Sequence, residues 1–501
     1  MTLKAGLFFA LWTLFVSMAP LGNSYAAPRG LPADVEAALD QAKLPRDALV
    51  AVVQEVGSNT SRVSWQPQKL VNPASLTKLI TTSAALDLLG PAWTWATPVW
   101  LQGTLQNGVL DGNLHIKGSG DPKLVMERLW LLLRRVQQLG VREIRGDIVL
   151  DRSAFNLAEQ GPGDFDGESL RPYNASADAL LLNYKSVVLT FTPTLTRGAA
   201  VVSMDPPLQG VKSDASLPLS NAPCDDWRSA LKADFSDPTR IKLNGSFSAA
   251  CGEKQWAVAY ADPKSYNARV LGGMWSEMGG KLGGVVRDGP SPANLGPTNL
   301  PPTFEVLSPP LAEVVRDINK FSNNVMAQQL FLSLALAQRG QGTVEAARDV
   351  LREWLTAKLS ERTGDINKGV VIDNGSGLSR DARVTAQMMA RLLQVAMASS
   401  AMPELLSSLP VSGVDGTLRR SKSPAGRAHL KTGSLRDVMG VAGVVLANSG
   451  RRYVVVAIVN HANANAARPA IDALVKWAVV NDARIDAAGN FGTNHNSTPE
   501  Q

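Results

Sequence analysis

The texture of the chain changes twice along its length, and this pattern limits the folds that the sequence can adopt. Residues 97–299 alternate short β-type runs with Gly, Pro, Asn and Asp, whereas helical periodicities and longer strands occupy both flanks. We therefore predict a discontinuous domain of residues 27–97 and 300–485, interrupted by strand-rich inserted domains at 98–299. One inserted domain is expected to lie inside another, with an inner part at about 122–171.

The flanks predict an α/β (α+β) fold, an antiparallel sheet built from both chain ends with helices on its faces. The N-terminal flank contains a β-hairpin pattern and then a helix at 76–89, with Asn72 as its cap and Pro73 in its first turn. The C-terminal flank contains several helical patterns, a hairpin and a last helix. These patterns lie at 311–338, 343–357, 385–397, 441–460 and 467–479.

The N-terminal residues indicate an exported protein. Lys4, the apolar run 7–18 and the small residues Ser24 and Ala26 are typical of a signal peptide at 1–26, with an uncleaved anchor as the alternative. No later segment has the length and apolar character of a membrane span, and the polar tail 486–501 is expected to be disordered. The net charge of +6 is spread without a basic run, which argues against a nucleic-acid partner. We expect a periplasmic location.

The chain contains two cysteines, Cys224 and Cys251. In an exported protein such a pair predicts a disulfide, with two unpaired buried thiols as the alternative. Neither cysteine lies near the candidate catalytic residues, and the four histidines fit no metal-ligand spacing. We therefore expect neither a metal nor another cofactor.

The first candidate for catalysis is the run Ser75-Leu76-Thr77-Lys78. A spacing of three on a helix places Ser75 and Lys78 on one face. A serine hydroxyl becomes a good nucleophile when a neighbouring base takes its proton, and a lysine with a lowered pKa is such a base. The pattern is weak alone, because it also occurs at 229–232, where we attribute it to chance.

A second candidate is the pair Ser322 and Asn324, at the start of an apolar helical run. If the backbone turns there, the hydroxyl could relay a proton while the carboxamide holds a substrate amide. The alternative is an ordinary helix cap, and residues 265–267 match the same Ser-x-Asn pattern.

The third candidate, Lys431-Thr432-Gly433-Ser434, opens the C-terminal extended segment. A strand edge there could pair with an extended peptide, Gly433 would permit close approach of substrate, and Lys431 would attract a carboxylate. The alternative is a lysine at the start of a strand. The conjunction of the three motifs in this order is more specific than any of them, and closely related elements occur in penicillin-binding proteins and β-lactamases.

The chain resembles low-molecular-mass class C penicillin-binding proteins, the D-alanyl-D-alanine carboxypeptidase/endopeptidase family, over nearly all of its predicted mature length. The three motifs carry the resemblance, together with the glycine-rich run 373–380 and the long gap between the first and second motifs. It implies a penicillin-binding, serine β-lactamase-like transpeptidase fold, peptidoglycan stem peptides as substrates and inhibition by β-lactams. It also implies that Ser75 is acylated, that Lys78 is the base, and that Ser322, Asn324 and Lys431 complete the catalytic group.

The resemblance further implies which residues bind the substrate. Thr432 and Ser434, beside Gly433, would hold the terminal carboxylate and the oxyanion. Arg380 and an acidic residue of the insert would recognise a peptide side chain. We expect the acid to be Asp166, although two other acids, at 164 and 168, lie close to it in the sequence.

Two other functions remain open on the sequence. A β-lactamase or esterase on the same fold would turn over the antibiotic rapidly, and the large insert argues against it. A non-catalytic sensor of wall peptides would keep the fold without peptide hydrolysis, and the presence of all three motifs argues against it.

Overall fold

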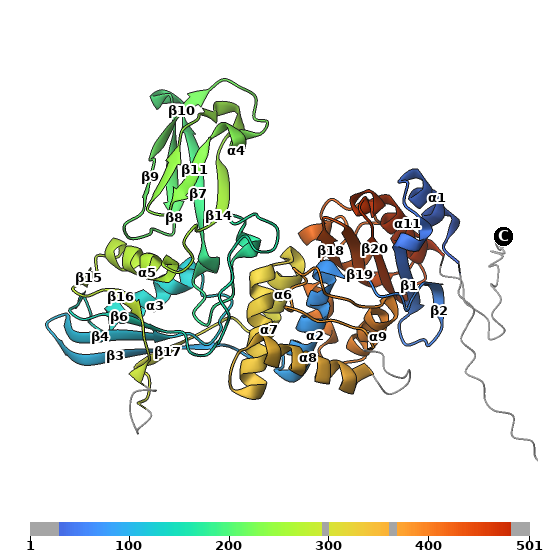
Figure 1. Cartoon of the computed structure of the whole chain (residues 1–501), viewed down its shortest axis with the longest axis horizontal. Coiled ribbons are helices and arrows are strands. Elements are labelled where there is room, and N and C mark those ends of the chain that lie inside the picture. Colours follow the sequence, from blue (N-terminus) through green and yellow to red (C-terminus); the bar gives the residue numbers. More distant parts are fainter. Residues whose placement is uncertain (1–29, 293–299, 360–367, 482–501) are drawn as a thin grey trace, which may run out of the picture.

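The computed structural model of the protein describes residues 30–292, 300–359 and 368–481. A sheet with helices on both faces lies at one end of the molecule, and an insert extends away from it (Figure 1). The predicted fold class is confirmed, because the first sheet is antiparallel and the insert is rich in strands. The signal peptide expected at 1–26 and the tail expected at 486–501 fall outside the described residues.

The sheet of the discontinuous domain joins strands from both ends of the chain. Its order is β18-β19-β20-β1-β2, with every neighbouring pair antiparallel. The strands are β1 (Leu49–Glu55), β2 (Ser61–Trp65), β18 (Ala428–Leu435), β19 (Val438–Leu446) and β20 (Arg452–Asn460). β1 pairs with β20 from Leu49 opposite Val459 to Glu55 opposite Tyr453. β18 is an edge strand whose first residues, 428–430, are bonded to the segment 410–412, so a further extended chain can pair with it from Lys431 onward.

Side chains of β1 alternate between two hydrophobic layers, as the pleat of a strand requires. Val50 and Val52 join the larger layer, whereas Leu49, Ala51 and Val53 join the other. The larger layer contains α2 (Thr77–Leu88), α6 (Leu311–Phe321), α7 (Asn324–Arg339), α8 (Val344–Leu359), α9 (Ala386–Met397) and α10 (Met402–Ser408). The other layer contains α1 (Ala33–Gln41) and α11 (Arg468–Val480).

The outer part of the insert is a mixed sheet with two helices packed on it. Its strands are β3 (Ala96–Gln106), β4 (Val109–Lys117), β5 (Glu143–Ile144), β6 (Ile148–Asp151), β15 (Lys281–Leu282), β16 (Val286–Asp288) and β17 (Phe304–Leu307). The helices are α3 (Met126–Gln138) and α5 (Tyr266–Glu277), whose buried apolar residues form one cluster with the sheet. The 265–267 match to Ser-x-Asn therefore lies at the start of α5, in the insert.

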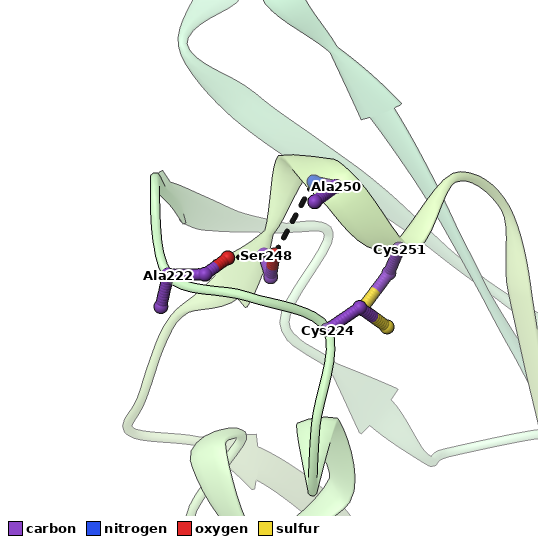
Figure 2. Close-up of a disulfide and its surroundings, with 5 residues drawn as sticks. All are labelled: Ala222, Cys224, Ser248, Ala250 and Cys251. Carbon is purple, nitrogen blue, oxygen red and sulfur yellow. Dashed lines mark hydrogen bonds between the residues drawn. A yellow bond between two sulfur atoms is a disulfide. The ribbon is translucent and has the colours of Figure 1, made fainter.

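The inner part of the insert is a separate strand-rich body. It contains β7 (Ser186–Thr194), β8 (Ala199–Asp205), β9 (Lys212–Ser213), β10 (Ser216–Ser220), β11 (Ala233–Asp237), β12 (Arg240–Leu243), β13 (Phe247–Ser248) and β14 (Lys254–Ala259), with the short helix α4 (Trp227–Ala230). A disulfide joins Cys224 to Cys251 at one end of this body, beside Ser248, whose hydroxyl donates to Ala222 O and accepts from Ala250 N (Figure 2).

The predicted inner part at about 122–171 is wrong. That range contains α3, β5 and β6, and β6 pairs with both β4 and β16 of the outer sheet. The nested segment is instead 186–259, because strand patterns alone do not reveal which sheet a strand joins. The outer boundaries also move, since β3 begins at Ala96 and pairs with β17 as far as Leu307. The insert therefore begins with β3 and ends with β17, and these two strands are neighbours in its sheet.

The insert is attached to the first domain through a buried glutamine of α7. Gln329 is 0% exposed, and its Nε2 donates to Gly120 O at 3.1 Å and to Asp178 O at 2.8 Å. Its Oε1 accepts from Asp178 N at 2.8 Å. Two separate loops of the insert are thus bound to the helix that begins at Asn324.

Candidate active site

Ser75 lies on a tight turn that precedes α2. Residues Ala74–Leu76 form a 3₁₀ turn, and Ala74 has a φ of 47°, in the left-handed region. Asn72 Oδ1 accepts from Ala74 N at 2.8 Å, while Asn72 exchanges two hydrogen bonds with the side chain of Asn460 on β20. The prediction that Asn72 caps the helix is wrong, since it stabilises this turn and α2 begins at Thr77.

Lys78 lies one turn further along and is fully buried. Its Nζ is 2.9 Å from Ser75 Oγ, 2.6 Å from Asn324 Oδ1 and 2.6 Å from the main-chain oxygen of Ser376. Burial, and after it the charge of Lys431, hold the pKa of Lys78 well below its ordinary value. A lysine of this kind is a base within hydrogen-bond distance of a serine hydroxyl.

Ser322 and Asn324 lie where the backbone turns between two helices. The apolar pattern at 311–338 is divided into α6 and α7, because Ser322 has a left-handed conformation with φ 57° and ψ 37°. Asn323 caps α7, since its Oδ1 accepts from Met326 N at 3.0 Å. Asn324 therefore directs its amide oxygen to Lys78 while Ser322 accepts from Lys431 Nζ at 2.8 Å.

Lys431 lies on the edge strand β18 and is also fully buried. Its Nζ donates to Ser322 Oγ and to Thr432 O, each at 2.8 Å. Burial lowers the pKa of Lys431 to about 7. Each of the two lysines is therefore bonded to one side chain of the Ser322–Asn324 turn.

The rest of the third motif follows along β18. Thr432 Oγ1 lies 2.8 Å from Thr417 Oγ1, a side chain of the neighbouring loop. A Cβ added to Gly433 would meet Pro73 O at 2.7 Å and the Leu76 side chain at 3.1 Å. The missing side chain of Gly433 makes room for the turn that carries Ser75.

A cleft of about 710 Å³ opens beside these residues. Its wall combines the second and third motifs with residues from the insert and from the glycine-rich run. The lining residues are Phe165, Asp166, Tyr173, Asn324, Leu378, Arg380, Ser434, Leu435 and Arg436. The predicted binding residues Asp166, Arg380 and Ser434 thus share one cleft.

Asp166 is held in place by its neighbours in the insert. It accepts from Tyr173 Oη at 2.8 Å, from Asn174 Nδ2 at 2.7 Å and from Glu168 N at 3.0 Å. Desolvation acts in the opposite direction, but these hydrogen bonds and the charge of Arg380 outweigh it and lower the pKa of Asp166. Of the three acids considered, Asp164 and Glu168 do not line the cleft.

Arg380 faces the insert across the cleft. Its guanidinium carbon lies 4.8 Å from the centre of the Phe165 ring, and its Nη1 is 3.2 Å from Asp437 Oδ1. Arg436 also lines the cleft, in the turn between β18 and β19.

Sequence reasoning missed the contact between Lys78 and Ser376. The glycine-rich run 373–380 was noted only for its resemblance, and a main-chain oxygen that accepts from a lysine leaves no side-chain signature.

Within the described ranges, no group of three or more His, Cys, Asp or Glu side chains could hold a metal ion. In the same ranges no helix has the length and apolarity needed to cross a membrane.

The fold and this arrangement of two buried lysines, a serine and a Ser-x-Asn turn define an active-site serine enzyme of the penicillin-binding class. The sequence profile of the D-Ala-D-Ala carboxypeptidase 3 (S13) family matches residues 31–480. The chain belongs to this family, and it is a serine-type D-Ala-D-Ala carboxypeptidase. The family predicted from the motifs is confirmed.

Two D-alanyl-D-alanine carboxypeptidases match this chain over most of their length. D-alanyl-D-alanine carboxypeptidase DacB of Haemophilus influenzae is 25% identical over 83% of this chain and 86% of its own. A D-alanyl-D-alanine carboxypeptidase of an Actinomadura species is 27% identical over 87% of this chain and 82% of its own. The crystal structure of penicillin binding protein 4 from Haemophilus influenzae has the same fold, with a TM-score of 0.68 at 22% identity over 88% of this chain and 99% of its own.

Proposed function

We propose that Ser75 is the nucleophile that attacks the D-Ala-D-Ala bond of peptidoglycan stem peptides or cross-links. The observation that carries this proposal is the contact of 2.9 Å between Ser75 Oγ and the buried Nζ of Lys78. In the neutral form favoured by its low pKa, Lys78 takes the hydroxyl proton as the Oγ–C bond forms. The C–N bond then breaks, and the terminal D-Ala, or the linked strand, leaves with a proton on its nitrogen. Water hydrolyses the acyl-enzyme.

The second motif serves the leaving group and the substrate amide. Ser322 Oγ accepts a hydrogen bond from Lys431 Nζ, and in this proposal the hydroxyl passes a proton from that lysine to the departing nitrogen. Asn324 binds Lys78 and also lines the cleft, which suits it to hold a substrate amide.

The third motif binds the acyl donor. The open edge of β18 pairs with the extended peptide, and Lys431, Thr432 and Ser434 attract its terminal carboxylate. The main-chain amides of Ser75 and Ser434 stabilise the oxyanion, where hydrogen-bond donors act most strongly in a site protected from water.

The cleft beside Ser434 receives the side chain of an upstream peptide residue. Asp166 and Arg380 line it with opposite charges, so it suits a side chain that carries both an amino and a carboxylate group. This is the chemistry expected of the third residue in a diamino-acid-containing stem peptide.

Inhibition by β-lactams and a periplasmic location follow from the same proposal. A crystal structure of the penicillin binding protein 4 relative is described as a complex with a β-lactam, and a relative from Dictyostelium discoideum is named a penicillin-sensitive carboxypeptidase. A substrate of the cell wall and the signal pattern at 1–26 both favour export.

The test is to incubate the protein with fluorescent penicillin and to follow the adduct by intact mass over time. A long-lived adduct that Ser75→Ala abolishes supports the proposal. Ser229→Ala is the matched control, because Ser229 heads the second Ser-x-x-Lys run on α4 and should label normally. An adduct that clears within seconds would indicate a β-lactamase. The absence of any adduct from folded wild-type protein would indicate a sensor and refute the assignment of Ser75.

A further inference from the structure

Three oxygen atoms lie within hydrogen-bond distance of Lys78 Nζ, one more than the two N–H bonds of a neutral amine. A neutral amine has two N–H bonds and one lone pair, and it can take a proton only through the lone pair. Two carbonyl oxygens, Asn324 Oδ1 and Ser376 O, each lie 2.6 Å from Nζ, and Ser75 Oγ lies 2.9 Å away. When both N–H bonds point to the carbonyls, the lone pair is left for the Ser75 hydroxyl.

We propose that Asn374 is a positioning residue, which holds the Ser376 carbonyl so that the Lys78 lone pair faces Ser75. This inference rests on the proposed function of Ser75 and Lys78. It assigns to the glycine-rich run a part in the reaction that is distinct from lining the cleft.

The side chain of Asn374 organises the turn around that carbonyl. Its Oδ1 accepts from Ser376 N at 3.1 Å, from Ser376 Oγ at 2.9 Å and from Gly377 N at 3.2 Å. Its Nδ2 donates to Leu378 O at 2.7 Å, and Ser376 is fully buried. One side chain thus fixes both ends of the turn 374–378 and the orientation of its peptide planes.

Helix α2 fixes the same turn from the other side. Thr81, three residues after Lys78, is fully buried and donates from Oγ1 to Gly375 O at 2.7 Å. A Cβ at Gly377 would lie 1.9 Å from Ala74 O, so the turn also contacts the residue before the nucleophile. The Ser376 carbonyl therefore lies between Gly375, which is bonded to α2, and Gly377, which contacts the turn before α2.

The charges near Lys78 allow the orientation to be tested by pH. Lys431 on β18 lowers the pKa of Lys78, whereas Asp373, at the start of the turn, is paired with Arg348 of α8. If the Ser376 carbonyl moves away, the ammonium form of Lys78 loses an acceptor and its pKa falls further. The acid limb of the acylation profile should then move to lower pH, while the maximal rate falls because the lone pair is no longer held.

The variants are Asn374→Ala and Thr81→Val, with Thr81→Ser as the conservative replacement that keeps the hydroxyl. Thr82→Val is the matched control, because Thr82 is buried on the same helix but its hydroxyl donates to Lys78 O, not to the turn 374–378, and accepts from Asn319 Nδ2 of α6. The rate of acylation by fluorescent penicillin is measured from about pH 5 to 10 and divided by the fraction of protein that labels at long times. Wild-type protein is measured in parallel.

The expected result is a maximal acylation rate at least about tenfold lower in Asn374→Ala and Thr81→Val, with the acid limb at lower pH. Thr81→Ser should restore both, and Thr82→Val should match the wild type. If wild-type protein acylates and either Asn374→Ala or Thr81→Val has the wild-type profile per labelled molecule, the positioning role is refuted. If wild-type protein does not acylate, the proposed function fails and this inference fails with it.

Discussion

Replacement of Gln329 by alanine should weaken the attachment of the insert to the first domain. The change removes three buried hydrogen bonds, to Gly120 O, Asp178 O and Asp178 N. A buried polar group that loses its partner costs about 1–3 kcal/mol. Three such groups, two of them on the single residue Asp178, which can partly relax, lead us to expect a loss of about 3–5 kcal/mol in the free energy of unfolding.

The measurement is denaturant unfolding followed by tryptophan fluorescence, together with limited proteolysis of the loops that contain Gly120 and Asp178. Gln338→Ala is the control, because Gln338 is exposed near the end of the same helix and its replacement should change stability by less than about 0.5 kcal/mol. Gln329→Ala should also lower the midpoint of unfolding and speed cleavage in the two loops. A loss within about 1 kcal/mol of the control would refute the view that Gln329 joins the two parts.

Three further predictions concern pH, the disulfide and the turn that contains Ser75. Because the pKa of Lys431 is about 7, Lys431 loses its charge above that pH, and the KM of a D-Ala-D-Ala peptide should rise between about pH 7 and 9. The KM is measured from the rate of D-Ala release. A KM that stays constant over this range would contradict the prediction. Replacing Cys224 and Cys251 by serine, across a separation of 27 residues, should destabilise the inner insert by about 3–4 kcal/mol without changing acylation. Unfolding of the inner strands tests the loss of stability, and fluorescent penicillin labelling tests whether acylation is unchanged. Asn460→Ala removes both bonds to Asn72 and should slow acylation about tenfold, measured by the rate of labelling; a wild-type rate would show that the turn holds without them.

The sequence was sufficient where local chemistry and periodicity agree. The valine-rich β20 is buried along nearly its whole length, and its hairpin with β19 was predicted from the apolar runs and the turn between them. The order of the three motifs predicted which side chains meet, and the structure places Ser75 Oγ and Asn324 Oδ1 each within hydrogen-bond distance of Lys78 Nζ.

Other features have no local signature. Ser322 divides one apolar pattern into two helices, yet a serine in the left-handed region does not differ in sequence from a helical one. The nesting of the insert depends on which strands pair, and strand pairing is set by contacts between distant residues. The Ser376 carbonyl belongs to the main chain, so the identity of the residue says little about its role.

The position of β1 between β2 and β20 has a consequence for the biogenesis of the enzyme. All residues of the insert emerge before β18, β19 and β20 do, so the strands that complete the sheet beside β1 are among the last to be made. Pairing of strands so distant in the sequence is slow, whereas the insert can fold from contacts within itself. Ser75 and Lys78 therefore leave the ribosome early but acquire Lys431 only when the C-terminal strands dock. We expect a chain truncated before β18 to keep Ser75 and Lys78 but to lack Lys431, and therefore to remain inert.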